Sequence, residues 1–171
     1  MTKKTDFENI ALKHAALLFR YAYWLTGKKE IAEDLVQETF LRAWKNYDTV
    51  QNREGIKSWL ITILRHENAR RFEGKQLRSE AGFEIENIVS HYVEEDNRPE
   101  AYALRHALDT LPEDYKEPLL LKILCGYSTK EIAEILGVSP EAVTTRLYRA
   151  KHKLKDQLTG IGLSLSSGKI K

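Results

Sequence analysis

Residues 129–154 read TKEIAEILGVSPEAVTTRLYRAKHKL, and they decide the fold of the second half of the chain. Ala133 is a small residue where two short helices could cross closely, and Gly137, four positions later, tolerates the positive φ of a tight turn. Apolar side chains at helical spacing fill the positions between the two helices: Ile132, Leu136, Val138, Val143 and Leu147. Together these small, turn and apolar positions predict a helix-turn-helix.

The ends of both helices carry capping signals. Ser128 and Glu131 have the spacing of a capping box, which predicts a short helix over 129–136. Ser139 is a favourable N-cap and is followed by proline, a favourable first helical residue. The last long helix is therefore expected to begin there and to reach about Leu158.

In a DNA-binding helix-turn-helix the second helix lies in the major groove, with its early residues toward the base edges. The exposed candidates are Glu141, Thr144, Thr145, Tyr148, Arg149 and Lys151. Residues 139–155 hold five basic side chains against one acidic, and the lysines from Lys151 onward suit phosphate contacts. The alternative is an amphipathic helical hairpin with a solvated basic face.

Helical periodicity dominates the front half as well, and strand signals are scarce. Asp6 is expected to cap a first helix that Gly27 ends. A second helix is expected from about Lys29 to Tyr47, then a polar loop over 48–55 and a third helix. The third helix should turn Ile56, Trp59, Leu60, Ile63 and Leu64 inward and Ser58, Thr62, Arg65 and His66 outward.

The predicted fold class is all-α, with two small helical domains joined by a flexible acidic linker. The first domain is placed at residues 6–73, the linker at 74–98, the second domain at 99–158 and a mobile tail at 159–171. A local helix around 83–93 is left open. Within the second domain, Pro118 is expected to cause a kink or a later helix start.

Composition limits the classes of protein to which the chain could belong. The 171 residues are 42% hydrophobic, and no apolar run approaches the about 18 residues that span a bilayer. The start, MTKKTDFENI, is unlike a signal peptide. Cys125 is the single cysteine, which excludes an internal disulfide, and we interpret it as a buried core thiol. A cytoplasmic protein without membrane insertion is expected.

Charge is distributed in blocks, although the net charge is only +2. Residues 57–78 hold six basic side chains against two acidic, and residues 79–100 hold seven acidic against one basic. With the basic segment 139–155, two basic blocks flank an acidic one. This layout favours two sites for a polyanion joined by an anionic tether.

The expected second helix has an acidic face opposite its core stripe. Asp34, Gln37, Glu38 and Leu41 recur at steps of three and four. A stripe of acids, an amide and an exposed leucine suits docking onto a basic helical partner. On the residues alone, an ordinary solvated face is the favoured interpretation.

A resemblance reverses that interpretation. Residues 32–44 read AEDLVQETFLRAW and resemble the polymerase-binding helix of the sigma-70 superfamily. Residues from Leu111, LPEDYKEPLLLKILCGYSTKEIAEILGVSPEAVTTRLYRAKHKL, are similar to the family's upstream-promoter-binding domain. The resemblance covers about 7–158 and identifies the chain with the small, extracytoplasmic-function (ECF) members. It implies that the two domains are sigma region 2 and sigma region 4.

The resemblance also implies partners and sites. The acidic face would dock on the coiled coil of the largest subunit of core RNA polymerase, and the flap of the polymerase is a further partner. In such proteins a loop pocket captures a flipped promoter base, which must offset the cost of unstacking it. The candidates for downstream promoter DNA are Gln51, Asn52, Arg53, Lys57, Arg65 and Arg71. Tyr47 and Trp59 are candidates for stacking on single-stranded bases, although a core role is favoured for Trp59.

The acidic linker, with Glu80, Glu84, Glu86, Glu94, Glu95 and Asp96, would mimic nucleic acid inside the polymerase cleft; a solvated spacer is the alternative. An anti-sigma factor is a further partner in many relatives. The chain departs from the family pattern after Trp59, where His66 and Glu67 interrupt a basic run, so its base preference is not implied.

Two other classes of function were compared with this one. The five histidines are scattered and form no metal-binding pattern, and no phosphate loop or nucleophile elbow occurs, so neither catalysis, a metal site nor a cofactor is expected. A two-domain helix-turn-helix regulator that is not a polymerase subunit is the closer rival. Such a regulator usually has strands in its front half, which this sequence does not predict.

Overall fold

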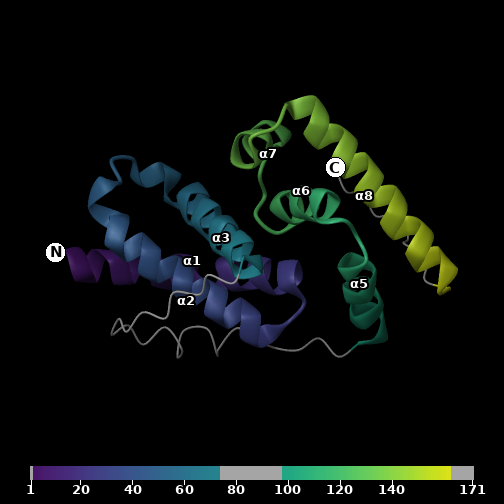
Figure 1. Cartoon of the computed structure of the whole chain (residues 1–171), viewed down its shortest axis with the longest axis horizontal. Coiled ribbons are helices and arrows are strands. Elements are labelled where there is room, and N and C mark those ends of the chain that lie inside the picture. The colour runs from purple at the N-terminus through teal and green to yellow at the C-terminus, as the bar shows by residue number, and fades with distance from the viewer. Residues whose placement is uncertain (1, 74–97, 163–171) are drawn as a thin grey trace. The chain divides into compact units, whose positions relative to one another are not determined.

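The computed structural model describes residues 2–73 and 98–162, and every regular element in those ranges is a helix (Figure 1). The predicted all-α class is confirmed. The chain divides into two compact units, one within residues 1–93 and one within 94–171. The linker prediction at 74–98, the local helix at 83–93 and most of the tail lie outside the described residues.

The first unit begins with α1 (Lys3–Thr26). Its N-cap is Thr2, whose side chain accepts a hydrogen bond from the Thr5 backbone N–H, so the expectation that Asp6 caps the helix is wrong. The helix begins four residues earlier than its apolar stripe indicated. Gly27 ends it as expected, with φ 72° and an N–H donated to the Tyr23 carbonyl at 2.8 Å.

Two further helices, α2 (Lys29–Asn46) and α3 (Ile56–Phe72), complete this unit. Two short 3-10 turns, η1 (Tyr47–Thr49) and η2 (Arg53–Gly55), connect them. Helix α2 packs against both α1 and α3. The largest fully buried side chains of the unit are Phe7, Leu18, Tyr21, Val36, Phe40, Leu60, Ile61 and Leu64.

The second unit contains α5 (Pro99–Asp109), α6 (Glu113–Ile123), α7 (Thr129–Leu136) and α8 (Pro140–Gly160). Helix α8 packs against the other three. It does so with a stripe at steps of three and four, made of Val143, Leu147, Ala150, Leu154 and Leu158. Cys125 is buried at 4% exposure, as expected for a core thiol.

Of the two outcomes expected at Pro118, a kink or a later helix start, the later start is not observed. Helix α6 begins at Glu113, and Pro118 lies inside it, buried. Pro118 lies little more than one turn from the helix start, and it lacks the N–H that would donate to the carbonyl of Asp114, four positions before it. Pro118 is itself buried, and burial of its apolar ring opposes the cost of the lost bond.

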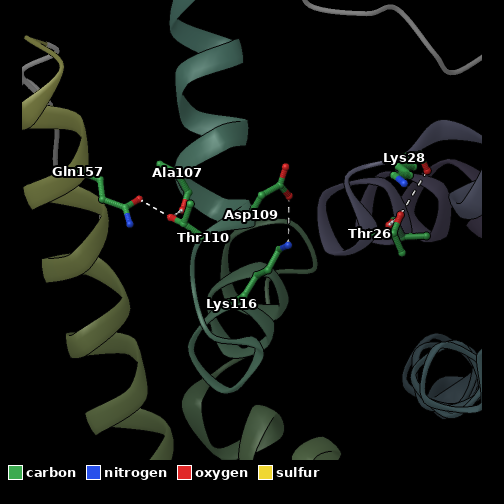
Figure 2. A network of polar contacts seen from close by, with 8 residues as sticks. Thr26, Lys28, Ala107, Asp109, Thr110, Lys116 and Gln157 are labelled. Atoms are coloured by element: carbon green, nitrogen blue, oxygen red, sulfur yellow. Dashed lines mark hydrogen bonds and ion pairs between the residues drawn. The ribbon is translucent and has the colours of Figure 1, made fainter. Parts of the chain in front are cut away.

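Polar contacts tie α5 to its neighbours in this unit (Figure 2). The Thr110 hydroxyl lies 2.8 Å from the Ala107 carbonyl and 2.8 Å from the side-chain amide of Gln157 on α8. Because a hydroxyl has one proton, it donates either to the Ala107 carbonyl or to the Gln157 Oε1 at any one time. Lys116 of α6, buried at 7% exposure, reaches the Asp109 carboxylate at 3.5 Å.

No helix in the two described ranges is long and apolar enough to cross a membrane.

Candidate nucleic-acid and protein interfaces

The turn between α7 and α8 has the geometry that the sequence predicts. Ser128 and Glu131 form a reciprocal capping box, with N–H···O distances of 2.7 and 3.2 Å. Gly137 adopts φ 66°, ψ 35°, and the N–H groups of Gly137 and Val138 both donate to the Ala133 carbonyl. These contacts satisfy both ends of an eight-residue helix and confirm the helix-turn-helix.

All six side chains expected to face upstream promoter DNA are exposed on α8: Glu141, Thr144, Thr145, Tyr148, Arg149 and Lys151. They lie opposite the buried stripe of the same helix. The hydroxyls of Thr144 and Thr145 each donate to the carbonyl four residues earlier, at 3.1 Å. Their oxygen lone pairs therefore remain available as acceptors, while a donor role requires a rotamer change.

Two contacts on this face were not foreseen from the sequence. Tyr148, at 63% exposure, lies over the His152 ring with centroids 4.0 Å apart. An Arg149 guanidinium N–H approaches the Tyr115 hydroxyl of α6 at 3.5 Å. The pair places two neighbouring aromatic rings on the exposed side of α8, beside its basic groups.

The acidic face of α2 is only partly as expected. Asp34 is exposed, and Gln37 and Glu38 are half-buried. Leu41, expected to be an exposed leucine, is buried at 9% exposure. Because α2 packs against α1 on one side and α3 on the other, its buried arc is wider than a single stripe and includes Leu41.

Behind this face is a charged pair between helices. Arg42 of α2 forms an ion pair with Glu67 of α3, whose carboxylate is also 4.0 Å from Arg70. Partial burial, followed by the negative charge of Glu67, raises the pKa of Glu38, and Arg42 opposes this shift. Folding thus places the Glu38 carboxylate of the acidic face in an environment that disfavours its ionised form.

The connection between α2 and α3 exposes Gln51, Asn52 and Arg53, the residues expected to meet a flipped base. Asn52 uses its side-chain oxygen to accept from the Glu54 N–H at 3.0 Å, which starts η2. The Arg53 guanidinium forms a two-pronged ion pair with Asp6 of α1, at 3.2 and 2.6 Å. The Tyr47 hydroxyl also donates to Asp6, at 2.6 Å.

The basic candidates on α3 lie along one side of it. Lys57 and Arg71 are about four turns apart and so point in similar directions, with Arg65 about a third of a turn from Arg71. All three are half-buried, and the Arg71 guanidinium lies 5.0 Å from the Phe72 ring centroid. Trp59 is half-buried as well, intermediate between a core residue and an open stacking face.

Helix α1 places a histidine near the basic side chains of α3, which the sequence did not indicate. Burial lowers the pKa of His14, and the charges of Lys13 and Lys57 lower it further. His14 of α1 is therefore near enough to Lys57 of α3 to feel its charge, and the neutral form of His14 is favoured. In the described ranges, no group of three or more His, Cys, Asp and Glu side chains is arranged to hold a metal ion.

Comparison with known proteins agrees with this geometry. Residues 10–78 match the family Sigma-70 region 2, and residues 101–154 match Sigma-70, region 4. An ECF RNA polymerase sigma factor, EcfG of Rhodopseudomonas palustris, is 36% identical over 141 residues, which cover 78% of this chain and 75% of that protein.

The chain belongs to the ECF RNA polymerase sigma factors.

Other relatives of this sigma factor support the assignment over most of its length. RNA polymerase sigma factor SigV of Bacillus subtilis is 34% identical over 157 residues, 88% of this chain and 90% of that one. Among solved structures, the sigma factor RpoE of Bartonella quintana, crystallised with the anti-sigma factor NepR, has a TM-score of 0.72 at 27% identity. That match covers 90% of this sigma factor and 97% of RpoE.

The structure also locates charged residues of the sigma factor that sequence reasoning missed. Glu67 follows Leu60 and Leu64 at helical spacing, so it lies on the buried stripe of α3, and a charge on a buried stripe signals a buried partner. Asp6 gave no such signal. Its partners Tyr47 and Arg53 are more than forty residues away, and only the packing of α1 beside α2 brings them together.

Proposed function

We propose that this sigma factor binds core RNA polymerase through the exposed acidic face of α2 and promoter DNA through the connection before α3, α3 itself and α8. The observation that carries the proposal is that one chain holds both sigma units, each with an exposed charged face of the kind its partner requires. The separate regulator is disfavoured because the front unit is helical throughout its described residues and matches Sigma-70 region 2.

On the polymerase side, Asp34, Gln37 and Glu38 are the proposed contacts, and the coiled coil of the largest subunit is the proposed partner. Leu41 would support this face from beneath rather than touch the partner, because it is buried. The raised pKa of Glu38 supports the assignment, because carboxylates crowded at a cost to the fold are typical of binding surfaces. The second unit would contact the polymerase flap.

On the DNA side, two sets of contacts are proposed. Gln51, Asn52 and Arg53 would hold an unstacked downstream base, with phosphates bound along α3 by Lys57, Arg65 and Arg71. Helix α8 would lie in the major groove of the upstream element, with Glu141, Thr144, Thr145, Tyr148 and Arg149 toward base edges and Lys151 on phosphate. The exposure of all six α8 residues supports this arrangement.

Two further properties form part of the proposal. The protein acts by binding and catalyses nothing itself, in the cytoplasm, where the polymerase works. An anti-sigma factor regulates it, which is supported by the similar structure of RpoE in complex with the anti-sigma factor NepR. A second similar structure, CnrH, is a complex with the cytosolic domain of CnrY. CnrH has a TM-score of 0.67 at 25% identity.

Reconstitution tests the function. Purified protein is mixed with core RNA polymerase and promoter fragments, and complex formation and transcription starts are measured. We expect a stable complex and initiation at defined sites without another sigma factor. The double variant Asp34→Lys, Glu38→Lys should lose core affinity and keep its helical content. Initiation only when a second sigma factor is added would instead support a separate regulator.

A further inference from the structure

We infer that Asp6, in the first turns of α1, is a positioning residue for the connection between α2 and α3: it sets the conformation in which Arg53 meets downstream promoter DNA. The inference rests on the proposed role of residues 51–53. Asp6 itself is not expected to touch DNA, since its side chain is 19% exposed and both of its oxygens are engaged within the protein.

The geometry around Asp6 joins three segments. One carboxylate oxygen accepts from Arg53 Nη1 at 3.2 Å, and the other accepts from Arg53 Nη2 and the Tyr47 hydroxyl, both at 2.6 Å. Tyr47 starts η1 and Arg53 starts η2. One side chain of α1 therefore holds both 3-10 turns that flank Gln51 and Asn52.

A second set of contacts from the same turns of α1 acts on the same connection. The Lys3 ammonium pairs with Asp48 at 2.5 Å and lies 4.7 Å from the Trp44 ring centroid. Phe7, at 1% exposure, packs edge-on against Trp44 and Tyr47, with centroids 5.3 Å apart in each case. The start of α1 is thus fixed by an apolar anchor, and its charged groups are aimed at residues 47–53.

The ion pair leaves Arg53 suited to a particular kind of contact. Asp6 compensates the charge of Arg53 and accepts one N–H from each of two guanidinium nitrogens. The Arg53 side chain nevertheless remains 71% exposed. A guanidinium has five N–H donors and two flat faces. Held in this way, Arg53 is better suited to stack on, or donate to, an extruded base than to attract phosphate as a free charge.

Pre-organisation explains why Asp6 should matter. A free arginine samples many rotamers, and fixing them at the moment of binding lowers affinity. Asp6 fixes Arg53 before DNA arrives. Loss of the carboxylate should therefore weaken binding of the downstream strand without changing core binding, because the proposed core contacts lie on α2.

The test uses the full protein assembled with core polymerase and a fluorescent single-stranded probe that carries the downstream element. Asp6→Asn keeps the side-chain size and an acceptor for Tyr47 but removes the charge-assisted pair. We expect about three- to tenfold weaker probe binding, with unchanged core affinity and partial recovery in Asp6→Glu. Glu8→Gln is the matched control, because Glu8 is a carboxylate in the first turns of α1 whose ion pair is with Lys4 of the same helix.

A double-variant cycle separates positioning from general support. In an Arg53→Ala background, Asp6→Asn should cause no further loss of probe binding, because Asp6 acts through Arg53. Additive losses, or an equal fall in core affinity, would overturn the inference. If Arg53→Ala weakens binding and Asp6→Asn does not, only the inference fails. If Arg53→Ala has no effect, the proposed role of the connection is wrong and the inference fails with it. Thermal unfolding of each variant identifies any loss that reflects misfolding.

Discussion

Glu38 illustrates, at the scale of one residue, a conflict between folding and binding. Its pKa is raised by partial burial and by Glu67, so the folded state disfavours the ionised form. The penalty is present when the group is ionised and disappears as pH falls through its folded pKa. A carboxylate at this position therefore costs stability at neutral pH, which is consistent with its proposed role in docking.

The first prediction concerns Glu38→Gln. The substitution should leave the unfolding temperature at pH 7 unchanged or slightly higher, because it removes a disfavoured charge, and it should weaken core binding. Unfolding and core affinity are both measured. Glu33→Gln is the control, since Glu33 pairs with Lys29 and lies about 140° around α2 from Glu38. Clear destabilisation by Glu38→Gln would contradict this account.

The second prediction is a pH dependence from His14. Its pKa is lowered in the folded protein, so the unfolded chain binds its proton more readily. The contribution of His14 to the free energy of unfolding should be complete above the ordinary histidine pKa of about 6.5. It should fall as pH decreases from there toward the pKa of His14 in the folded protein. His14→Gln should flatten this slope in unfolding measured between about pH 5 and 7, and an unchanged slope would contradict the prediction.

Single residues also show where sequence reasoning succeeds and fails. Ser128, Gly137 and Ser139 were predicted correctly because a cap or turn depends on neighbours in the sequence. The exposure of Leu41 was predicted wrongly, because the width of a buried arc depends on how many helices pack against it. The bonds of Asp6 to Tyr47 and Arg53 depend on tertiary packing and had no local signal.

At the scale of elements, the link between α7 and α8 depends on one backbone conformation. Gly137 has φ 66°, and a Cβ placed there would meet nothing within 4 Å. A side chain at this position would therefore be disfavoured by the backbone conformation alone, without a steric clash with neighbouring residues. The third prediction is that Gly137→Ala destabilises the second unit by about 1–2 kcal/mol. Gly160→Ala is the matched control, also open but without positive φ, and should be neutral or stabilising. Chemical unfolding measures both.

The fourth prediction concerns α8 as a reading surface. Arg149→Ala should weaken upstream-element binding, by about 1–3 kcal/mol if Arg149 contacts a base, and the loss should be largest for the preferred sequence. Lys151→Ala should weaken all sequences about equally and reduce the salt dependence, as for a phosphate contact. Affinities measured for matched and altered duplexes at two salt concentrations distinguish a base contact from a phosphate contact. A uniform loss for Arg149→Ala would reassign it to phosphate.

Most element boundaries followed from the sequence, and the two helix starts that did not, those of α1 and α6, are informative. Gly27, Ser128 and Pro140 marked ends that the structure confirms. The helix at Pro118 started earlier than expected, because a proline little more than one turn into a helix loses a single bond, and burial of its ring opposes that cost. Local rules locate helix ends well where a cap acts alone and less well where packing competes.

For the whole molecule, the composition already indicated two units, and the resemblance indicated what they bind. Basic segments at 57–78 and 139–155 fall in different units of the structure. What the sequence did not indicate is that the start of α1 holds the connection between α2 and α3, the segment proposed to meet downstream promoter DNA. That depends on three helices being packed together, which no single segment encodes.

Cys125 has a practical consequence. It is the only cysteine in the chain, it is buried, and it belongs to the second unit. An alkylating reagent can reach its sulfur only when that unit opens, so the speed of chemical tagging reports on this unit without any engineered label. The alkylation rate of the native thiol can therefore be compared with and without duplex DNA or a regulatory partner. A slower rate would mean that the added molecule slows the opening of the helix-turn-helix unit.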